Sequence, residues 1–159
     1  MTLRLRLSLS RGFGLLAGCL AFVAVAVAGE VAVAPVVDQS GLPPLGAEVR
    51  TNPYRANARA IEVGQSAFNQ ACARCHGIDA NPAGAPAPDL RQLNRYCRRI
   101  GEPAVQAACL ADNDAYFSKT VANGKTIVGV MHMPPWKNVL SPELVWAIQA
   151  FVEARAVAR

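Results

Sequence analysis

Two cysteines and a histidine stand close together near the middle of the chain, in the segment Cys72-Ala73-Arg74-Cys75-His76. Two thiols three positions apart at a helix end can add to the two vinyl groups on one edge of a haem. The histidine that follows then lies beneath the iron and offers it an imidazole nitrogen. The spacing therefore predicts one covalently bound haem c, attached through Cys72 and Cys75 and ligated by His76.

Two other uses of such a cysteine pair fit the surrounding sequence less well. A thioredoxin-like redox pair belongs in a strand–helix–strand context, and no strand pattern precedes Cys72. A zinc site needs further ligands close by, and the next cysteines, Cys97 and Cys109, pair more naturally with each other. Haem attachment is the interpretation that these residues favour.

An iron held on both faces needs a second ligand, and the chain offers few. Apart from the initiating residue, Met131 and Met133 are the only methionines, and His132 is the only other histidine. All three lie within residues 129–136, so this segment is predicted to be the distal loop. Thioethers and imidazoles both ligate haem iron, so chemistry alone leaves the choice among the three open.

A first helix is expected just before the haem motif, over residues 58–71, with Asn57 as its N-cap. Its apolar positions recur at three- and four-residue spacing, so they share one face: Ile61, Gly64, Phe68 and Ala71. A glycine in mid-helix costs about 1 kcal/mol relative to alanine. Gly64 is therefore expected where another helix crosses closely.

A last helix begins with a strong signal, because Ser141 is a good N-cap and Pro142 suits the first helical position. Its apolar stripe consists of Leu144, Val145, Ile148, Phe151 and Val152. A shorter helix is expected over residues 112–123, capped by Asp112 or a neighbour and ended by Gly124. Residues 77–88 and 129–140 are interpreted as irregular, and no strand pattern is found. The prediction is an all-α domain over residues 56–159, with three to five helices, after an extended segment over residues 29–55.

The first 28 residues have the layout of a secretory signal. Arg4, Arg6 and Arg11 precede an uncharged apolar run over residues 12–28, which ends in a small-x-small cleavage site. The alternatives are a retained membrane anchor, or lipidation at Cys19, which stands in a lipobox-like segment. Removing three of the 16 basic residues leaves 13 against 11 acidic ones. The basic residues are scattered, so nucleic-acid binding is not indicated.

Export places the remaining cysteines in an oxidising compartment, where thiols tend to pair. A disulfide between Cys97 and Cys109 is the simplest expectation, and a redox-active or intermolecular cysteine is the alternative. The start of this central insert carries four arginines: Arg91, Arg95, Arg98 and Arg99. They suit a haem propionate, an acidic partner or a solvated face, and the sequence leaves these open.

The haem motif after a first helix, the later Met133-Pro134-Pro135-Trp136 and the final amphipathic helix together resemble a class I cytochrome c. In that family the methionine before the prolines ligates the iron, so the resemblance implies Met133. It also implies the cytochrome c fold, with the first and last helices packed across each other, and an electron carrier rather than an enzyme.

A narrower resemblance rests on five pieces of sequence: residues 51–55, residues 67–77, the pair Cys97 and Cys109, residues 114–117 and residues 133–136. These pieces are similar to the soluble cytochromes that accept electrons from calcium- or lanthanide-dependent pyrroloquinoline quinone (PQQ) alcohol dehydrogenases. The resemblance implies a periplasmic shuttle toward a terminal oxidase. The rivals are a haem subunit of another periplasmic dehydrogenase, such as a sulfur-compound oxidising one, and a membrane-tethered cytochrome that serves an oxidase directly.

Overall fold

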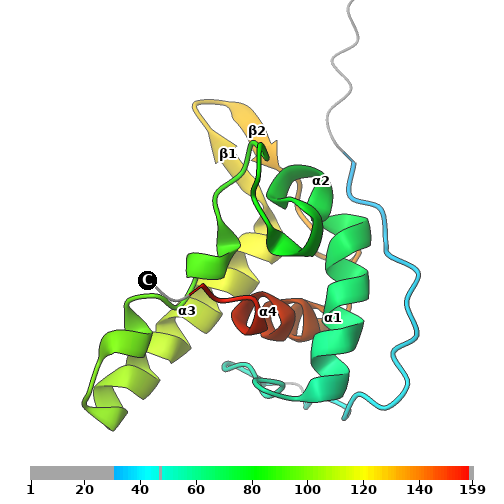
Figure 1. The fold of residues 1–159 in the computed structure, drawn as a ribbon. Coiled ribbons are helices and arrows are strands. Elements are labelled where there is room, and N and C mark those ends of the chain that lie inside the picture. Colours follow the sequence, from blue (N-terminus) through cyan, green and yellow to red (C-terminus); the bar gives the residue numbers. More distant parts are fainter. Residues whose placement is uncertain (1–30, 47, 158–159) are drawn as a thin grey trace, which may run out of the picture.

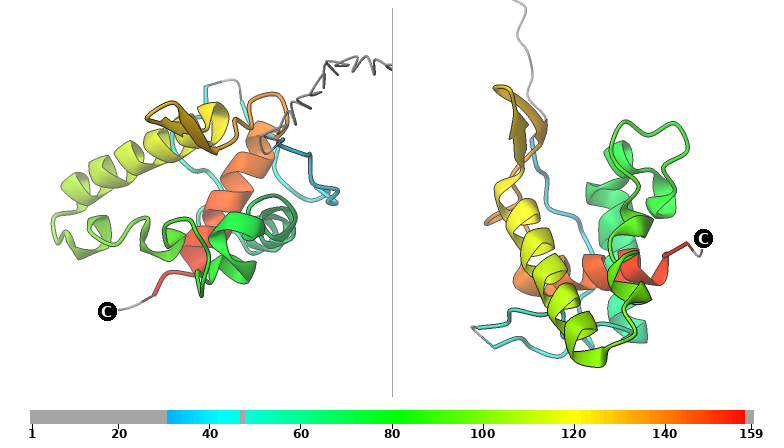
Figure 2. Two further views of the ribbon diagram at one scale, coloured as in Figure 1. Left: turned by 90° about the horizontal axis from the view of Figure 1, so that it is seen from above. Right: turned by 90° about the vertical axis from the view of Figure 1, so that its left-hand side faces the viewer.

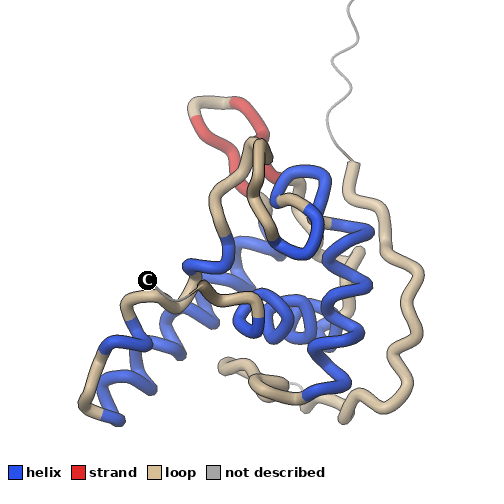
Figure 3. The backbone as a smooth tube through the Cα atoms, viewed as in Figure 1, coloured by secondary structure: helices blue, strands red, loops and turns tan. Residues whose placement is uncertain are grey.

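The computed structural model describes residues 31–46 and 48–157. Within them the α-helices are α1 (Ala58–Ala71), α2 (Ala73–His76), α3 (Pro103–Asn123) and α4 (Pro142–Ala154). Three short 3₁₀ turns and one hairpin, β1 (Lys125–Ile127) with β2 (Val130–Met133), complete the described elements (Figure 1). Helices dominate the described chain (Figure 3), which confirms the predicted all-α class.

The two helices that frame the core begin as their sequences predict. Asn57 Oδ1 accepts a hydrogen bond of 2.9 Å from Ala60 N at the start of α1. Ser141 Oγ accepts one of 3.2 Å from Leu144 N at the start of α4. Pro142 lies in the first turn of α4, where backbone N–H groups have no partner within the helix, so the missing N–H of proline costs no hydrogen bond. Both predicted caps and the bounds of α1 are confirmed.

The centre of the core is the crossing of α1 over α4 (Figure 2). A Cβ on Gly64 would lie 2.0 Å from the carbonyl oxygen of Ala147, so only glycine permits this approach. One turn further along α1, the ring centroids of Phe68 and Phe151 are 5.4 Å apart. Close helix packing therefore explains the unfavourable mid-helix glycine, as predicted.

The predicted start of α3 was wrong. The helix begins at Pro103, and Glu102 is its N-cap, with Oε1 accepting 3.2 Å from Ala104 N. A proline ends a preceding helix but also fits the first position of a new one. Here Pro103 starts the helix, so the residues between Pro103 and Asp112 are helical. The end was correct, because Gly124 closes the helix with a φ of +68°.

The hairpin corrects the expectation of an irregular segment without strands. β1 and β2 run antiparallel, with Lys125 opposite Met133 and Ile127 opposite Val130. The turn between them holds Val128 and Gly129 at φ of +49° and +77°. Short runs of β-branched residues on both sides of a glycine turn favour a hairpin, but the runs were too short to stand out.

The described residues ahead of α1 form neither helix nor strand, and they run alongside the domain (Figure 1). Val36 exchanges two hydrogen bonds with the Gln70 side chain, of 3.0 and 3.1 Å. Arg59 donates to the carbonyl oxygen of Ser40 at 2.9 Å, and the Tyr54 hydroxyl donates to the carbonyl oxygen of Pro43. This segment, residues 31–46 and 48–57, is called the strap below. In the described part of the chain, no helix is both long and apolar enough to span a bilayer.

Candidate haem site

Cys72, Cys75 and His76 lie together on a single helical turn that continues directly from α1. Cys72 N donates to Phe68 O at 2.8 Å, and this bond ends α1. Cys75 N and His76 N both donate to Cys72 O, at 3.1 and 3.0 Å, which closes the turn of α2. All three residues are half-buried. The structure therefore brings the three motif residues to one edge of the α1–α4 core.

The environment of the thiols differs from that of a thiol–disulfide exchange site. Burial raises the pKa of Cys72 to about 12, and the neighbouring Cys75 raises it as well. Thiol exchange needs a thiolate, which reactive cysteines obtain through a lowered pKa. Cys97 and Cys109 are joined in a disulfide, so they are not available as zinc ligands beside the motif.

The ring of His76 is oriented by a neighbouring loop. Its Nδ1 lies 3.2 Å from the carbonyl oxygen of Pro88. Because a carbonyl only accepts, Nδ1 carries the hydrogen and Nε2 keeps a lone pair. Burial lowers the pKa of His76, partly opposed by this hydrogen bond, so burial favours the neutral ring. A neutral imidazole with one oriented nitrogen is the form that ligates a metal.

The loop after His76 is held in a left-handed conformation by side chains from α1. Asp79 and Ala80 have φ of +53° and +57°, a conformation that is uncommon for residues other than glycine. Asn69 and Asp79 clamp this loop: Asn69 Oδ1 accepts from Asp79 N at 2.9 Å, and Asn69 Nδ2 donates to Asp79 Oδ1 at 2.9 Å. Gln65 Nε2 donates to the same carboxylate at 2.8 Å. These contacts fix the loop that leaves the motif.

The three candidate distal ligands differ in burial. Met131 is 48% exposed and His132 is exposed, whereas Met133 packs against the hydrophobic core. Of the three, Met133 is the side chain that the fold directs inward.

The backbone around Met133 is tied to the end of α3. A Cβ on Gly124 would lie 2.3 Å from the carbonyl oxygen of Met133, so the helix end and the strand touch there. Trp136 N donates to Val121 O and Lys137 N donates to Ala122 O, both at 3.0 Å. These carbonyls belong to the last turn of α3, which has no helical partners for them. The Met-Pro-Pro-Trp segment thus caps the helix.

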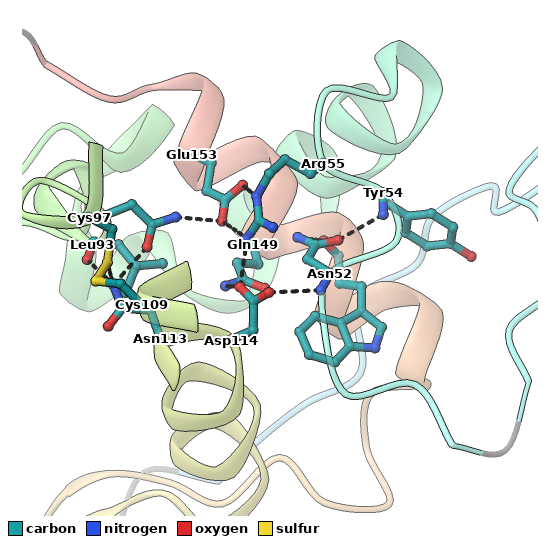
Figure 4. A network of polar contacts seen from close by, with 12 residues as sticks. Asn52, Tyr54, Arg55, Leu93, Cys97, Cys109, Asn113, Asp114, Gln149 and Glu153 are labelled. Carbon is teal, nitrogen blue, oxygen red and sulfur yellow. Dashed lines mark hydrogen bonds and ion pairs between the residues drawn. A yellow bond between two sulfur atoms is a disulfide. The ribbon is translucent and has the colours of Figure 1, made fainter. Parts of the chain in front are cut away.

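A buried carboxylate joins the strap, α3 and α4 (Figure 4). Asp114 is fully buried and accepts three hydrogen bonds: 2.9 Å from Asn52 N, 2.7 Å from Gln149 Nε2 and 2.7 Å from Arg55 Nη2. Arg55 also grips Glu153 through Nε and Nη2, both at 2.8 Å. Asn52, Arg55 and Asp114 come from two of the sequence pieces that carry the narrower resemblance, and they meet here.

The predicted disulfide between Cys97 and Cys109 is present, with the two Cα atoms 5.5 Å apart. Asn113 Nδ2 donates to the carbonyl oxygen of Leu93 at 3.0 Å and to Asn94 Oδ1 at 2.9 Å. Asn94 in turn donates to Glu153 at 2.8 Å. The disulfide-containing insert is therefore attached to the same polar network as the strap.

Sequence reasoning missed the residues that position the site from a distance. Asp79 carried no recognised motif, although an Asp followed by a small residue after a glycine is a turn signal. Asn69 was noted only within the resemblance over residues 67–77, and Gly124 only as the end of a helix. Gln149 was visible as a single polar residue inside the apolar stretch of α4, and its complete burial identifies it as a partner of another buried group.

Known proteins are similar to this chain in sequence. The family model described as cytochrome C oxidase, cbb3-type, subunit III matches residues 59–152. Cytochrome c550 of Pseudomonas aeruginosa is 39% identical over 149 residues, covering 91% of this chain and 92% of that protein. The crystal structure of cytochrome CL from the marine methylotroph Methylophaga aminisulfidivorans is 19% identical and has a TM-score of 0.43, covering 79% of this chain and 81% of that one.

The family match spans more than half of the chain, and the relative from Pseudomonas aligns over nearly its whole length. Proteins of this kind carry electrons on haem that is bound covalently through a Cys-x-x-Cys-His motif. The chain therefore belongs to the class I c-type cytochromes.

Proposed function

We propose that the chain is a periplasmic electron carrier with a single haem c. In this proposal Cys72 and Cys75 form the thioether links, and His76 and Met133 ligate the iron from opposite faces. The observation that carries it is the orientation of His76, whose Nδ1–H is engaged by Pro88 while Nε2 keeps its lone pair. The inward position of Met133, with Met131 and His132 exposed, supports the distal assignment.

The donor set fits a haem c. Two thiols and a neutral imidazole stand on one helical turn, and one thioether packs against the core. When bound, the haem supplies a one-electron change at its iron. The protein's part is to hold the group on both faces and to surround it with apolar side chains. Side chains at both axial positions leave none for a substrate, which supports a carrier rather than an enzyme.

A methionine as the distal ligand affects the reduction potential of the haem. A thioether favours ferrous iron relative to a second imidazole, so it raises the reduction potential. Axial ligands tune haem potentials over a range of about 0.8 V. A carrier with one imidazole and one thioether is therefore suited to accept electrons from a dehydrogenase and to pass them to a terminal oxidase.

We further propose that the donor is a PQQ-dependent alcohol dehydrogenase that uses calcium or a lanthanide. The support is the narrower sequence resemblance, which covers residues 51–55, 67–77, 114–117 and 133–136 and the pair Cys97 and Cys109. Two of these pieces contribute Asn52, Arg55 and Asp114 to the buried network, so they have a structural role in common.

Export belongs to the same proposal, with residues 1–28 as a signal, residues 29–55 as an extended segment and residues 56–159 as the cytochrome domain. The family match over residues 59–152 lies inside that domain. The signal and Cys19 lie outside the described residues. The mass of the mature protein distinguishes cleavage after Ala28 from lipidation at Cys19 and from a retained anchor.

The test begins with the protein purified from an exporting host. After denaturation, haem should remain attached to the chain at one equivalent per polypeptide. The ferric protein is then mixed with a purified PQQ alcohol dehydrogenase, its alcohol and calcium or a lanthanide, and the reduced haem bands are followed. Fast reduction is expected. Rapid reduction only by another enzyme, such as a sulfur-compound dehydrogenase, would contradict the donor assignment but leave the carrier intact.

A further inference from the structure

The insert between the haem loop and α4 projects from the body of the molecule. The segment from Leu93 to Leu110, called the arm below, comprises a 3₁₀ turn and the first part of α3, and it lies at one extremity in every view (Figures 1 and 2). None of residues 101–110 is buried. The outer end of the arm therefore contributes little to the core, and packing alone does not explain its presence.

The arm is nevertheless rigidly held. The disulfide between Cys97 and Cys109 joins its two limbs. Gln106 Nε2 donates across it to the carbonyl oxygens of Cys97 and Ile100, at 3.3 and 3.1 Å. Asn113 anchors its base to Leu93 and Asn94. A braced projection loses little further conformational entropy when it binds a partner.

The surface of the arm is positively charged. The arm contains three arginines, Arg95, Arg98 and Arg99, and a single acidic residue, Glu102, whose side chain caps α3. Arg91 lies just before the arm and pairs with Asp89 at 3.0 Å. The Arg98 and Arg99 side chains are exposed and form no ion pair within the described residues. Tyr96 is 72% exposed, and the guanidinium of Arg95 lies 5.5 Å from its ring centroid.

A hollow of about 400 Å³ opens at the base of the arm. Arg98 and Leu110 line it from the arm, and Ile61 and Ala150 line it from the core. The arm thus combines exposed arginine and tyrosine, the residue types enriched in protein interfaces, with a concave and largely apolar surface beside Arg98.

We propose that the arm is a docking element for an acidic surface on the protein that exchanges electrons with this chain. The occupant is acidic because the exposed charge of the arm is uncompensated and positive. The inference rests on the proposed function as an electron carrier. Exposed charges of this kind act mainly on the rate of association, and salt weakens their effect.

The test compares the holoprotein with the double variant Arg98→Gln/Arg99→Gln, which removes two positive charges from exposed side chains. The matched control is Arg50→Glu, which lowers the net charge by the same amount on the strap, where Arg50 is also exposed. Stopped-flow reduction by PQQ alcohol dehydrogenase and its alcohol is measured from low to high salt. Oxidation of each ferrous protein by membranes that contain a terminal oxidase is measured in parallel.

At low salt the arm variant should react about 3- to 10-fold more slowly in at least one of the two assays, with a shallower salt dependence than the wild type. Arg50→Glu should stay close to the wild type, and all three proteins should be reduced equally by ascorbate. If the dehydrogenase does not reduce the wild type, the proposed donor is wrong, and the oxidation assay alone decides on the arm. Equal rates for Arg98→Gln/Arg99→Gln and wild type in every working assay, or an equal loss in Arg50→Glu, would overturn the docking role.

Discussion

At the scale of single residues, burial separates side chains that chemistry alone leaves equivalent. Met131 and Met133 offer the same thioether, two positions apart on one strand, yet Met133 alone packs against the core. The backbone of Met133 lies close to the end of α3, where a Cβ on Gly124 would be 2.3 Å from the carbonyl oxygen of Met133. If Met133 is the distal ligand, as proposed, it is therefore selected by backbone position more than by ligand type.

Replacing Met133 with leucine should remove the thioether–iron absorption band at the red end of the ferric spectrum. The reduction potential should fall, because the ligand that favours ferrous iron is lost. Visible spectroscopy and a redox titration measure both effects. Met131→Leu is the matched control and should keep the band. Loss of the band in Met131→Leu, with Met133→Leu unchanged, would reassign the ligand.

A second prediction at this scale concerns the clamp between Asn69 and Asp79. Hydrogen bonds from Asn69, and then from Gln65, lower the pKa of Asp79 below its usual value. A carboxyl group whose pKa is lower in the folded state stabilises the fold at pH values above its pKa in the unfolded chain, which is about 3.9. That contribution is lost as the pH falls through the folded pKa.

Asn69→Leu should therefore lower the melting temperature at pH 7, and the difference from the wild type should shrink at pH values below about 3.9. Thermal unfolding of the holoprotein across pH measures this. Ser66→Ala, on the same helix, is the control and should show no comparable change. A melting temperature for Asn69→Leu that differs from the wild type equally at all pH values would show that the clamp does not act through the charge of Asp79.

At the scale of elements, local signals were sufficient for the helices that frame the site. The N-caps at Asn57 and Ser141 depend on residues only a few positions away in the sequence. Gly64 indicated a close helix crossing, which the structure contains. The start of α3 was missed because Pro103 reads both as a helix breaker and as a first helical residue. The hairpin was missed because its strands are only three and four residues long.

The crossing of α1 and α4 should be sensitive to one methyl group. Gly64→Ala places a Cβ against the backbone of Ala147, which cannot rotate away as a side chain could. Such overpacking should lower the free energy of unfolding by about 1–3 kcal/mol. Denaturant unfolding of the holoprotein measures the loss. Gly46→Ala is the matched control, since no atom lies within 4 Å of its Cβ position. Equal stability of the two variants would contradict the close crossing.

At the scale of the whole molecule, the polar network links distant parts of the sequence. Asp114 binds the strap through Asn52 and Arg55 and binds α4 through Gln149. The haem motif was readable because its residues are adjacent, whereas this network joins residues up to 98 positions apart. No local pattern encodes such pairing, so the sequence alone did not predict it.

Asp114→Ala should leave three donors without their acceptor, among them a guanidinium that is one-third exposed. The expected loss in the free energy of unfolding is about 3 kcal/mol, since Arg55 keeps Glu153 and some contact with water. Asp112→Ala, an exposed position on the same helix, should stay within about 0.5 kcal/mol of the wild type. Denaturant titration measures the free energy of unfolding of both variants. An equal loss in Asp114→Ala and Asp112→Ala would show that the buried network adds nothing beyond surface charge.

The crossing of α1 and α4 also affects when Cys72 and Cys75 are accessible during folding. Before α4 packs across α1, the helix that ends beside Cys72 has no tertiary partner, and an isolated helix of 14 residues is marginal in water. In the folded protein Cys72 and Cys75 are half-buried. A haem that is attached through these thiols, as proposed, therefore reaches them most easily before α4 packs across α1.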